Sequence, residues 1–119
     1  GGGGVPLIRR PDGDLVSFDG VVDKDRTSAL LAESVGADAL LLLTDVSAVM
    51  RDWNTPSASD IRQATVAELR ALHLAEGSMS PKAEAACRFV ERTGGRAVIG
   101  ALSDAVAMLE GRAGTLVLP

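Results

Sequence analysis

Ala37-Asp38-Ala39-Leu40-Leu41-Leu42-Leu43-Thr44 is an almost unbroken apolar run, and it decides the fold class of this chain. Such a run is typical of a strand that is covered on both faces, as in a parallel sheet. The segment before it, Asp23 to Val35, has the pattern of a helix that Gly36 ends. Leu15 to Val22 reads as extended, so the three segments predict a right-handed strand, helix and strand crossover. The apolar stripe of the helix is expected to consist of Leu30, Leu31 and Val35.

Helices and strands alternate through the rest of the chain. Thr65-Val66-Ala67-Glu68 is a capping box that opens a short helix to about Leu72. Ser80 as N-cap and Pro81 at the first helical position predict a longer helix through Arg92. The order predicts an α/β fold with a mainly parallel sheet. The remaining expected elements are strands ending at Leu7–Ile8 and over Ala97–Gly100 and Thr115–Leu118, a helix over Ser103–Leu109 with Ser103 as N-cap, and a short extended piece within Val46–Asn54.

Composition limits the class of protein. The 119 residues are 46% hydrophobic and 24% charged, which predicts one soluble domain over residues 1–119. A net charge of −4 gives no general attraction to nucleic acid or to an anionic membrane, so any anion needs a local site. The longest apolar run is far shorter than a membrane span. The single Cys87 excludes an internal disulfide and fits a reducing cytoplasm, and it is expected to be a small core residue.

Gly77-Ser78-Met79-Ser80-Pro81-Lys82 has the features of an anion site at a helix N-terminus. The first turn offers unpaired N–H donors and partial positive charge, and Gly77 allows close approach to a ligand. Lys82 opposes the helix dipole, which suggests that a negative group such as a phosphate lies between them. The alternative is a solvated lysine on an ordinary capped helix. Gly1 to Gly4 similarly reads either as a ligand-contacting loop of a longer protein or as a remnant of expression.

Four segments could meet at the carboxyl edge of the predicted sheet, where open α/β sheets bind ligands. They are the opening glycines, Asp23-Lys24-Asp25, Thr44-Asp45 and Gly77 to Lys82. Lysines, helix N-termini and carboxylates in one cleft suit phosphoryl transfer, which needs positioning and charge neutralisation. A charged first helical turn is the alternative for Asp23-Lys24-Asp25. The pattern contains no zinc motif, no Ser-His-Asp set and no Walker motif, and the lone His73 is expected on the surface.

Together these motifs closely resemble the carboxyl-terminal part of carbamate kinases, members of the amino-acid kinase superfamily. The resemblance implies a three-layer α/β/α sandwich and phosphate transfer between ATP and carbamate, run in cells mostly toward ATP in arginine and carbamoyl phosphate catabolism. The motifs that carry it are Gly1-Gly2-Gly3-Gly4-Val5-Pro6, Val22-Asp23-Lys24-Asp25, Ala29-Leu30-Leu31-Ala32-Glu33, Gly36-Ala37-Asp38, Leu43-Thr44-Asp45-Val46, Gly77-Ser78-Met79-Ser80-Pro81-Lys82 and Leu109-Glu110-Gly111-Arg112-Ala113-Gly114-Thr115.

The resemblance also implies roles for single residues. Lys24 and Lys82 would stabilise the transferring phosphoryl group, and Asp25 would orient both lysines. Lys82→Ala would then abolish transfer in a complete protein and leave the fold intact. Magnesium is implied through the ATP chemistry, with no metal ligand assigned in the chain. The other implied residues are Thr44, Asp45, Val46 and Val49 for adenine and ribose, Gly77, Ser78 and Met79 for the nucleotide phosphates, and Gly1, Gly2, Gly3 and Gly4 for carbamate or its phosphate.

Three departures from the family pattern qualify this prediction. Ser80 stands where the family usually has glycine, and Leu72-His73-Leu74 replaces a Gly-His-Phe sequence. Family members are more than twice as long, so the chain would supply the nucleotide-binding half of an expected homodimeric enzyme. Alone it would bind nucleotide weakly or not at all. The alternatives are another kinase of the superfamily, acting on an amino-acid carboxylate or a nucleoside monophosphate, and a non-catalytic binding or assembly module.

Overall fold

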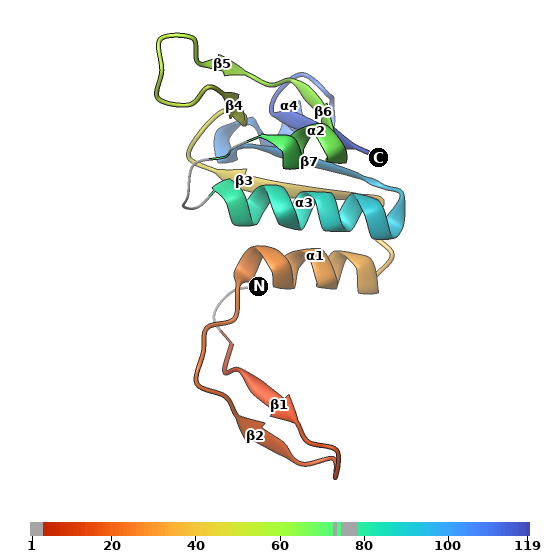
Figure 1. The fold of residues 1–119 in the computed structure, drawn as a ribbon. Helices are drawn as coiled ribbons and strands as arrows, with labels where there is room; N and C mark the ends of the chain where they lie inside the picture. The colour runs from red at the N-terminus through yellow and green to blue at the C-terminus, as the bar shows by residue number, and fades with distance from the viewer. Residues whose placement is uncertain (1–3, 73, 75–78) are drawn as a thin grey trace.

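The computed structural model describes residues 4–72, 74 and 79–119. Its centre is a four-stranded sheet in the order β3-β7-β8-β6 (Figure 1). β3 is parallel to β7, β6 is parallel to β8, and β7 and β8 are antiparallel. The sheet is therefore mixed and mostly parallel, as the sequence predicts. The strands are β3 (Ala39–Thr44), β6 (Gln63–Thr65), β7 (Arg96–Ala101) and β8 (Thr115–Leu118).

Helices lie on both faces of this sheet, which gives the three-layer arrangement (Figure 1). α3 (Met79–Thr93) covers one face, with α2 (Val66–Ala71) beside it and α1 (Lys24–Ser34) packed outside it. The short turn η1 (Leu102–Asp104) and α4 (Ala105–Leu109) lie on the other face. Successive residues of β7 face opposite sides of the sheet, so this strand contacts both helical layers. Ala97 and Ile99 belong to the core under α3, whereas Gly100 lies against Met108 of α4.

The core is built from aliphatic and small side chains. α3 is amphipathic, and its buried face is made largely of alanines, together with Cys87, Phe89 and Val90. Cys87 is 1% exposed, so its predicted place in the core is confirmed. Small residues on α3 allow both the sheet and α1 to approach this helix closely. Each fully buried aliphatic or aromatic side chain stabilises the fold by about 1.5–3 kcal/mol.

The predicted crossover from Leu15–Val22 into β3 is wrong. The first strands, β1 (Leu7–Arg9) and β2 (Leu15–Ser17), pair with each other in an antiparallel hairpin that extends away from the sheet (Figure 1). The turn at Pro11-Asp12-Gly13, with Gly13 at φ +93°, favours this local pairing. The hairpin raises the radius of gyration to 15.7 Å, against about 13.5 Å for a compact chain of this length.

The predicted apolar stripe of α1 is also wrong. Leu30, Leu31 and Val35 are 44%, 56% and 69% exposed. The buried residues of α1 are Asp25, Ala29 and Ala32. Because α1 packs mainly against α3 and contacts the sheet at β3, its contact face uses small residues, and its large apolar side chains are exposed.

Several helix ends follow the sequence and two do not. The capping box is confirmed, with Thr65 Oγ1 accepting from the Glu68 N–H and Glu68 accepting from the Thr65 N–H. Asp23 caps α1 by accepting from the Arg26 N–H at 2.8 Å. Ser80 is not an N-cap, since α3 already includes Met79. Ser103 lies within η1, and Asp104 precedes α4 without a side-chain cap.

The stretch of chain that connects β3 to β6 forms an arm that projects from the sheet. It contains the paired strands β4 (Met50–Arg51) and β5 (Ser59–Asp60), so the extended piece predicted within Val46–Asn54 is confirmed in part. β3 forms one edge of the four-stranded sheet, with β7 as its neighbour. In the part of the chain described, no helix is long and apolar enough to cross a membrane.

We expect Gly114→Ala to destabilise the chain more than Gly111→Ala. Both glycines have positive φ, +78° and +74°, so each alanine costs about 1–2 kcal/mol of backbone strain. At Gly114 the new Cβ would also lie 2.8 Å from the Ile99 carbonyl oxygen, whereas nothing lies within 4 Å at Gly111. Urea unfolding should show a further loss of about 1–3 kcal/mol at Gly114. Equal midpoints for the two variants would contradict this close packing.

Candidate functional site

The carboxyl edge of the sheet brings together three of the predicted segments. Short connections join the end of α1 to the start of β3 and the end of α3 to the start of β7. Both helices therefore begin at the edge where β3 ends at Thr44 (Figure 1). Lys24 and Asp25 are in the first turn of α1, and Lys82 is in the first turn of α3. Two helix N-termini and these charged groups thus share one edge with Thr44 and Asp45.

Lys82 and Asp25 form a buried ion pair between α3 and α1. The Lys82 Nζ donates to Asp25 Oδ1 at 3.0 Å and to Oδ2 at 3.2 Å. The two residues are 5% and 7% exposed. The negative group predicted beside Lys82 is therefore supplied by the chain itself. An ammonium group carries three donors, so a carboxylate that holds Nζ in place does not exhaust its capacity to bind a further anion.

Lys24 takes a different position beside the same carboxylate. Its Nζ lies 4.0 Å from Asp25 Oδ2, and its side chain is 66% exposed. Asp25 thus lies next to both lysines, as the predicted orienting role requires. Lys82 is fixed by burial, whereas Lys24 remains in solvent.

The residues predicted to bind the nucleotide at and after the end of β3 differ in their exposure to solvent. Thr44 donates from Oγ1 to Asp45 Oδ1 at 3.1 Å, and Asp45 is exposed at the edge. Val46 is half-buried. Val49 is fully buried within the core, so its predicted contact with adenine or ribose is not supported by its position. The apolar side chain packs inward because the chain turns back toward the sheet at this point.

The glycine-rich predictions fall mostly outside the described residues. Gly1, Gly2, Gly3, Gly77 and Ser78 are not described, and neither is His73. Gly4 is exposed, with open space where a Cβ would lie. Met79 begins α3 and packs against the core, which leaves its predicted phosphate contact to the backbone.

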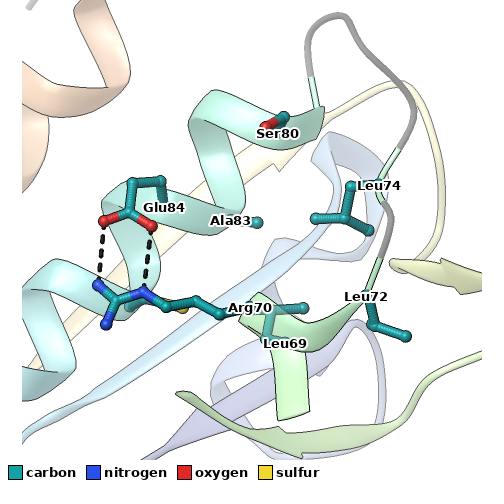
Figure 2. Close-up of a pocket in the computed structure, with 8 residues that line it drawn as sticks. Leu69, Arg70, Leu72, Leu74, Ser80, Ala83 and Glu84 are labelled. Carbon is teal, nitrogen blue, oxygen red and sulfur yellow. Dashed lines mark hydrogen bonds and ion pairs between the residues drawn. The ribbon is translucent and has the colours of Figure 1, made fainter. Parts of the chain in front are cut away.

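A hollow lies between α2 and α3 (Figure 2). Arg70 spans its rim and donates to both carboxylate oxygens of Glu84, at 3.2 and 3.0 Å, and also to Glu91. The hydrogen bonds to Glu84 and Glu91 raise the pKa of Arg70 above its usual range. Because two carboxylates satisfy this guanidinium, we do not assign an anion site to the hollow. The residues that line it are Leu69, Arg70, Leu72, Leu74, Ser80, Ala83, Glu84 and Cys87.

Within residues 4–72, 74 and 79–119, no group of three or more His, Cys, Asp or Glu side chains could hold a metal ion. One buried polar residue there was absent from the predicted site: Thr115 is 0% exposed. A threonine that opens a strand gives no local signal that its hydroxyl is buried, so only the structure identifies it.

Comparison with known proteins identifies the family and the fold. The model of the amino acid kinase family matches residues 3–101. The chain belongs to the amino acid kinase family. Within the family it is a carbamate kinase homologue. It is 45% identical over 115 residues to carbamate kinase from Haemophilus influenzae, covering 97% of this chain and 37% of the relative. Against carbamate kinase from Pyrococcus furiosus the identity is 45% over 123 residues, covering 100% and 39%.

A solved structure shows the same fold. Carbamate kinase from Giardia lamblia bound to AMP-PNP superposes with a TM-score of 0.91 at 36% identity, covering 98% of this chain and 42% of that one. Uridylate kinase from Archaeoglobus fulgidus, at 20% identity and a TM-score of 0.62, shares the fold alone. The present chain therefore spans about two fifths of the length of the carbamate kinases that it matches.

We expect each single replacement in the buried pair to lower the free energy of unfolding strongly, and the double replacement to lower it less. Lys82→Met leaves the Asp25 carboxylate buried without its partner, which costs about 3–5 kcal/mol. Removing both charges in Asp25→Asn/Lys82→Met should restore part of this loss. The burial of Lys82 thus revises the expectation that its replacement leaves the fold intact. Urea unfolding of the parent, the two single variants and the double variant measures the coupling.

The control for this cycle is an exposed pair between the same two helices. Arg92 Nε donates to both Glu33 carboxylate oxygens at 2.8 Å, with side chains 53% and 28% exposed. Arg92→Met should cost no more than about 1 kcal/mol. A loss from Lys82→Met no larger than that from Arg92→Met would contradict the buried pair.

We expect the Cys87 thiol to be inert in the folded chain. Burial raises the pKa of this thiol to about 11, and only the thiolate is nucleophilic. At pH 8 an aromatic disulfide reagent should react with Cys87 slowly in buffer and rapidly in denaturing urea, with the released thiol followed by absorbance. Fast reaction of the native chain would show that the thiol is accessible.

Proposed function

We propose that this chain is the carboxyl-terminal, nucleotide-binding part of a carbamate kinase-like phosphotransferase. The reaction joins ATP and carbamate, itself formed from ammonia and bicarbonate, to give ADP and carbamoyl phosphate. The reverse, ATP-forming direction would serve arginine and carbamoyl phosphate breakdown in the cytoplasm. The observation that carries the proposal is the buried Lys82–Asp25 pair at the carboxyl edge of the sheet.

The pair suits the charge demands of phosphoryl transfer. As a carbamate oxygen bonds to the γ-phosphorus, the bond from this phosphorus to the β–γ bridging oxygen breaks and ADP leaves. Negative charge is spread over the transferring group and the bridging oxygen, so fixed cations lower the barrier. Lys82 would supply a cation whose position Asp25 fixes at 3.0 Å, and exposed Lys24 would approach the group from the first turn of α1.

The nucleotide would bind along the end of β3. The Asp45 carboxylate is exposed there and could accept hydrogen bonds from ribose hydroxyls, with Thr44 and Val46 beside it. Gly77, Ser78 and Met79 would bring backbone N–H groups to the phosphates. Magnesium would arrive with the nucleotide and be held by its phosphates. Gly1 to Gly4 would contact carbamate or its phosphate.

The other part of a carbamate kinase would complete the site. The matched relatives are about two and a half times the length of this chain, and we propose that the remainder supplies most of the carbamate site and a homodimer interface. The same length difference favours a second candidate, in which the chain is a nucleotide-binding module without catalysis of its own.

Calorimetric titration with magnesium–ADP tests the proposal. We expect weak binding to the 119-residue chain, weakened about tenfold further by Asp45→Ala through loss of the ribose contacts. The double variant Asp25→Asn/Lys82→Met should also bind more weakly, because it removes the phosphate-facing ammonium without leaving a buried charge. The matched control is Asp19→Ala, which removes an exposed carboxylate in the linker before α1 and should change nothing.

Each outcome supports or contradicts the proposal. Binding that weakens in both site variants and not in the control supports a nucleotide half. No binding by a chain that still unfolds cooperatively would contradict the proposed nucleotide site. Robust ATP formation from carbamoyl phosphate and ADP by the chain alone would contradict its description as half of a site.

A further inference from the structure

Thr115 forms a hydrogen-bonded bridge between two distant segments. Its Oγ1 accepts from the Val49 N–H at 2.8 Å and donates to the Ile61 carbonyl oxygen at 2.5 Å. Its side chain is 0% exposed. Of the buried polar residues in the described part of the chain, Asp25 and Lys82 satisfy each other, and Thr115 is the third. Its hydroxyl thus both donates and accepts within the protein, and its burial excludes water from these two bonds.

The bridge completes an interrupted antiparallel ladder. β4 and β5 pair through Met50 with Asp60 and Arg51 with Ser59, so Val49 and Ile61 are the next opposing residues. The Ile61 N–H donates to the Val49 carbonyl at 2.8 Å. An ordinary hydrogen-bonded pair would also join the Val49 N–H directly to the Ile61 carbonyl. The Thr115 hydroxyl stands between these two groups and relays that second bond.

This relay fixes one end of the segment that follows β3. The other end, at Thr44, is held by the pairing of β3 with β7. Between the two anchors the segment contains Asp45, and the Ser47 carbonyl oxygen passes close to Gly100, 3.1 Å from where a Cβ would lie. The position of Asp45 at the edge therefore depends on how firmly Val49 is held against β8.

We propose that Thr115 is a positioning residue for nucleotide binding, which its hydroxyl serves by anchoring the segment from Thr44 to Val49. The inference rests on the proposed function, because that segment is where the nucleotide would bind. Thr115 itself touches no ligand. It acts through Val49, whose buried side chain and bridged N–H set the path of the backbone that carries Asp45.

Thr115→Val, a replacement of similar size without the hydroxyl, tests the anchor in the 119-residue chain. It leaves the Val49 N–H and the Ile61 carbonyl unpaired and buried. We expect magnesium–ADP affinity by calorimetry to fall about tenfold, while Thr115→Ser keeps affinity within about twofold because the hydroxyl is retained. Amide hydrogen exchange followed by NMR should speed up at Val49 in Thr115→Val relative to Ile99 in the sheet centre.

Val117→Ala is the matched control, because Val117 lies on the same strand and is also fully buried. It should destabilise the whole sheet and raise exchange throughout, without a selective change at Val49 and without loss of affinity in the folded chain. Should Thr115→Val not unfold cooperatively, Thr115→Cys, with a weaker donor and acceptor of similar size, should give an intermediate affinity.

The outcomes that overturn the inference are distinct from those that overturn the proposed function. Unchanged affinity in Thr115→Val or Thr115→Cys, or an equal loss in Thr115→Ser, would contradict the positioning role. No ADP binding by the parent chain would contradict the proposed function and the nucleotide part of this inference with it. The exchange experiment would then still decide whether Thr115 anchors the segment.

Discussion

The buried ion pair between Lys82 and Asp25 links the parts of this molecule on which the candidate site depends. It joins the first turn of α3 to the first turn of α1 across 57 residues of sequence. Two charges removed from water are tolerated only with near-ideal geometry, so the pair constrains how the helices pack. The same constraint holds the Lys82 ammonium group at the carboxyl edge of the sheet, where Asp45 follows the end of β3.

Small residues make this arrangement possible. α1 rests on α3 through Ala29 and Ala32, and a close approach of the two helices brings the lysine of one within reach of the carboxylate of the other. The outward-facing leucines of α1 are the consequence of this packing. A second buried polar group, the Thr115 hydroxyl, joins the sheet to the segment after β3. Both devices are buried polar contacts that join segments far apart in the sequence.

Local chemistry made part of the fold predictable. Thr65 and Glu68 are three residues apart, and their reciprocal hydrogen bonds need no distant partner. Gly36 ends α1 with a φ of +68°, as its place after the helix indicates. The apolar run of β3 marked a strand at once. Likewise the segments at Lys24, Asp45 and Lys82 could be placed at one edge of the sheet, because the ends of helices and strands follow from element order.

The sequence by itself indicated most of the elements and the family, since caps, turns and apolar runs are properties of neighbouring residues, whereas the short strands β5 and β6 were not expected. Tertiary structure alone decided which strands pair and which faces are buried. Leu15 to Ser17 pairs with its hairpin neighbour and not with the sheet, because a nearby turn closes at a lower entropic cost than a crossover. Only packing shows that Lys82 is buried against Asp25 and that Thr115 bridges Val49 and Ile61, because those partners lie 54 to 66 residues apart.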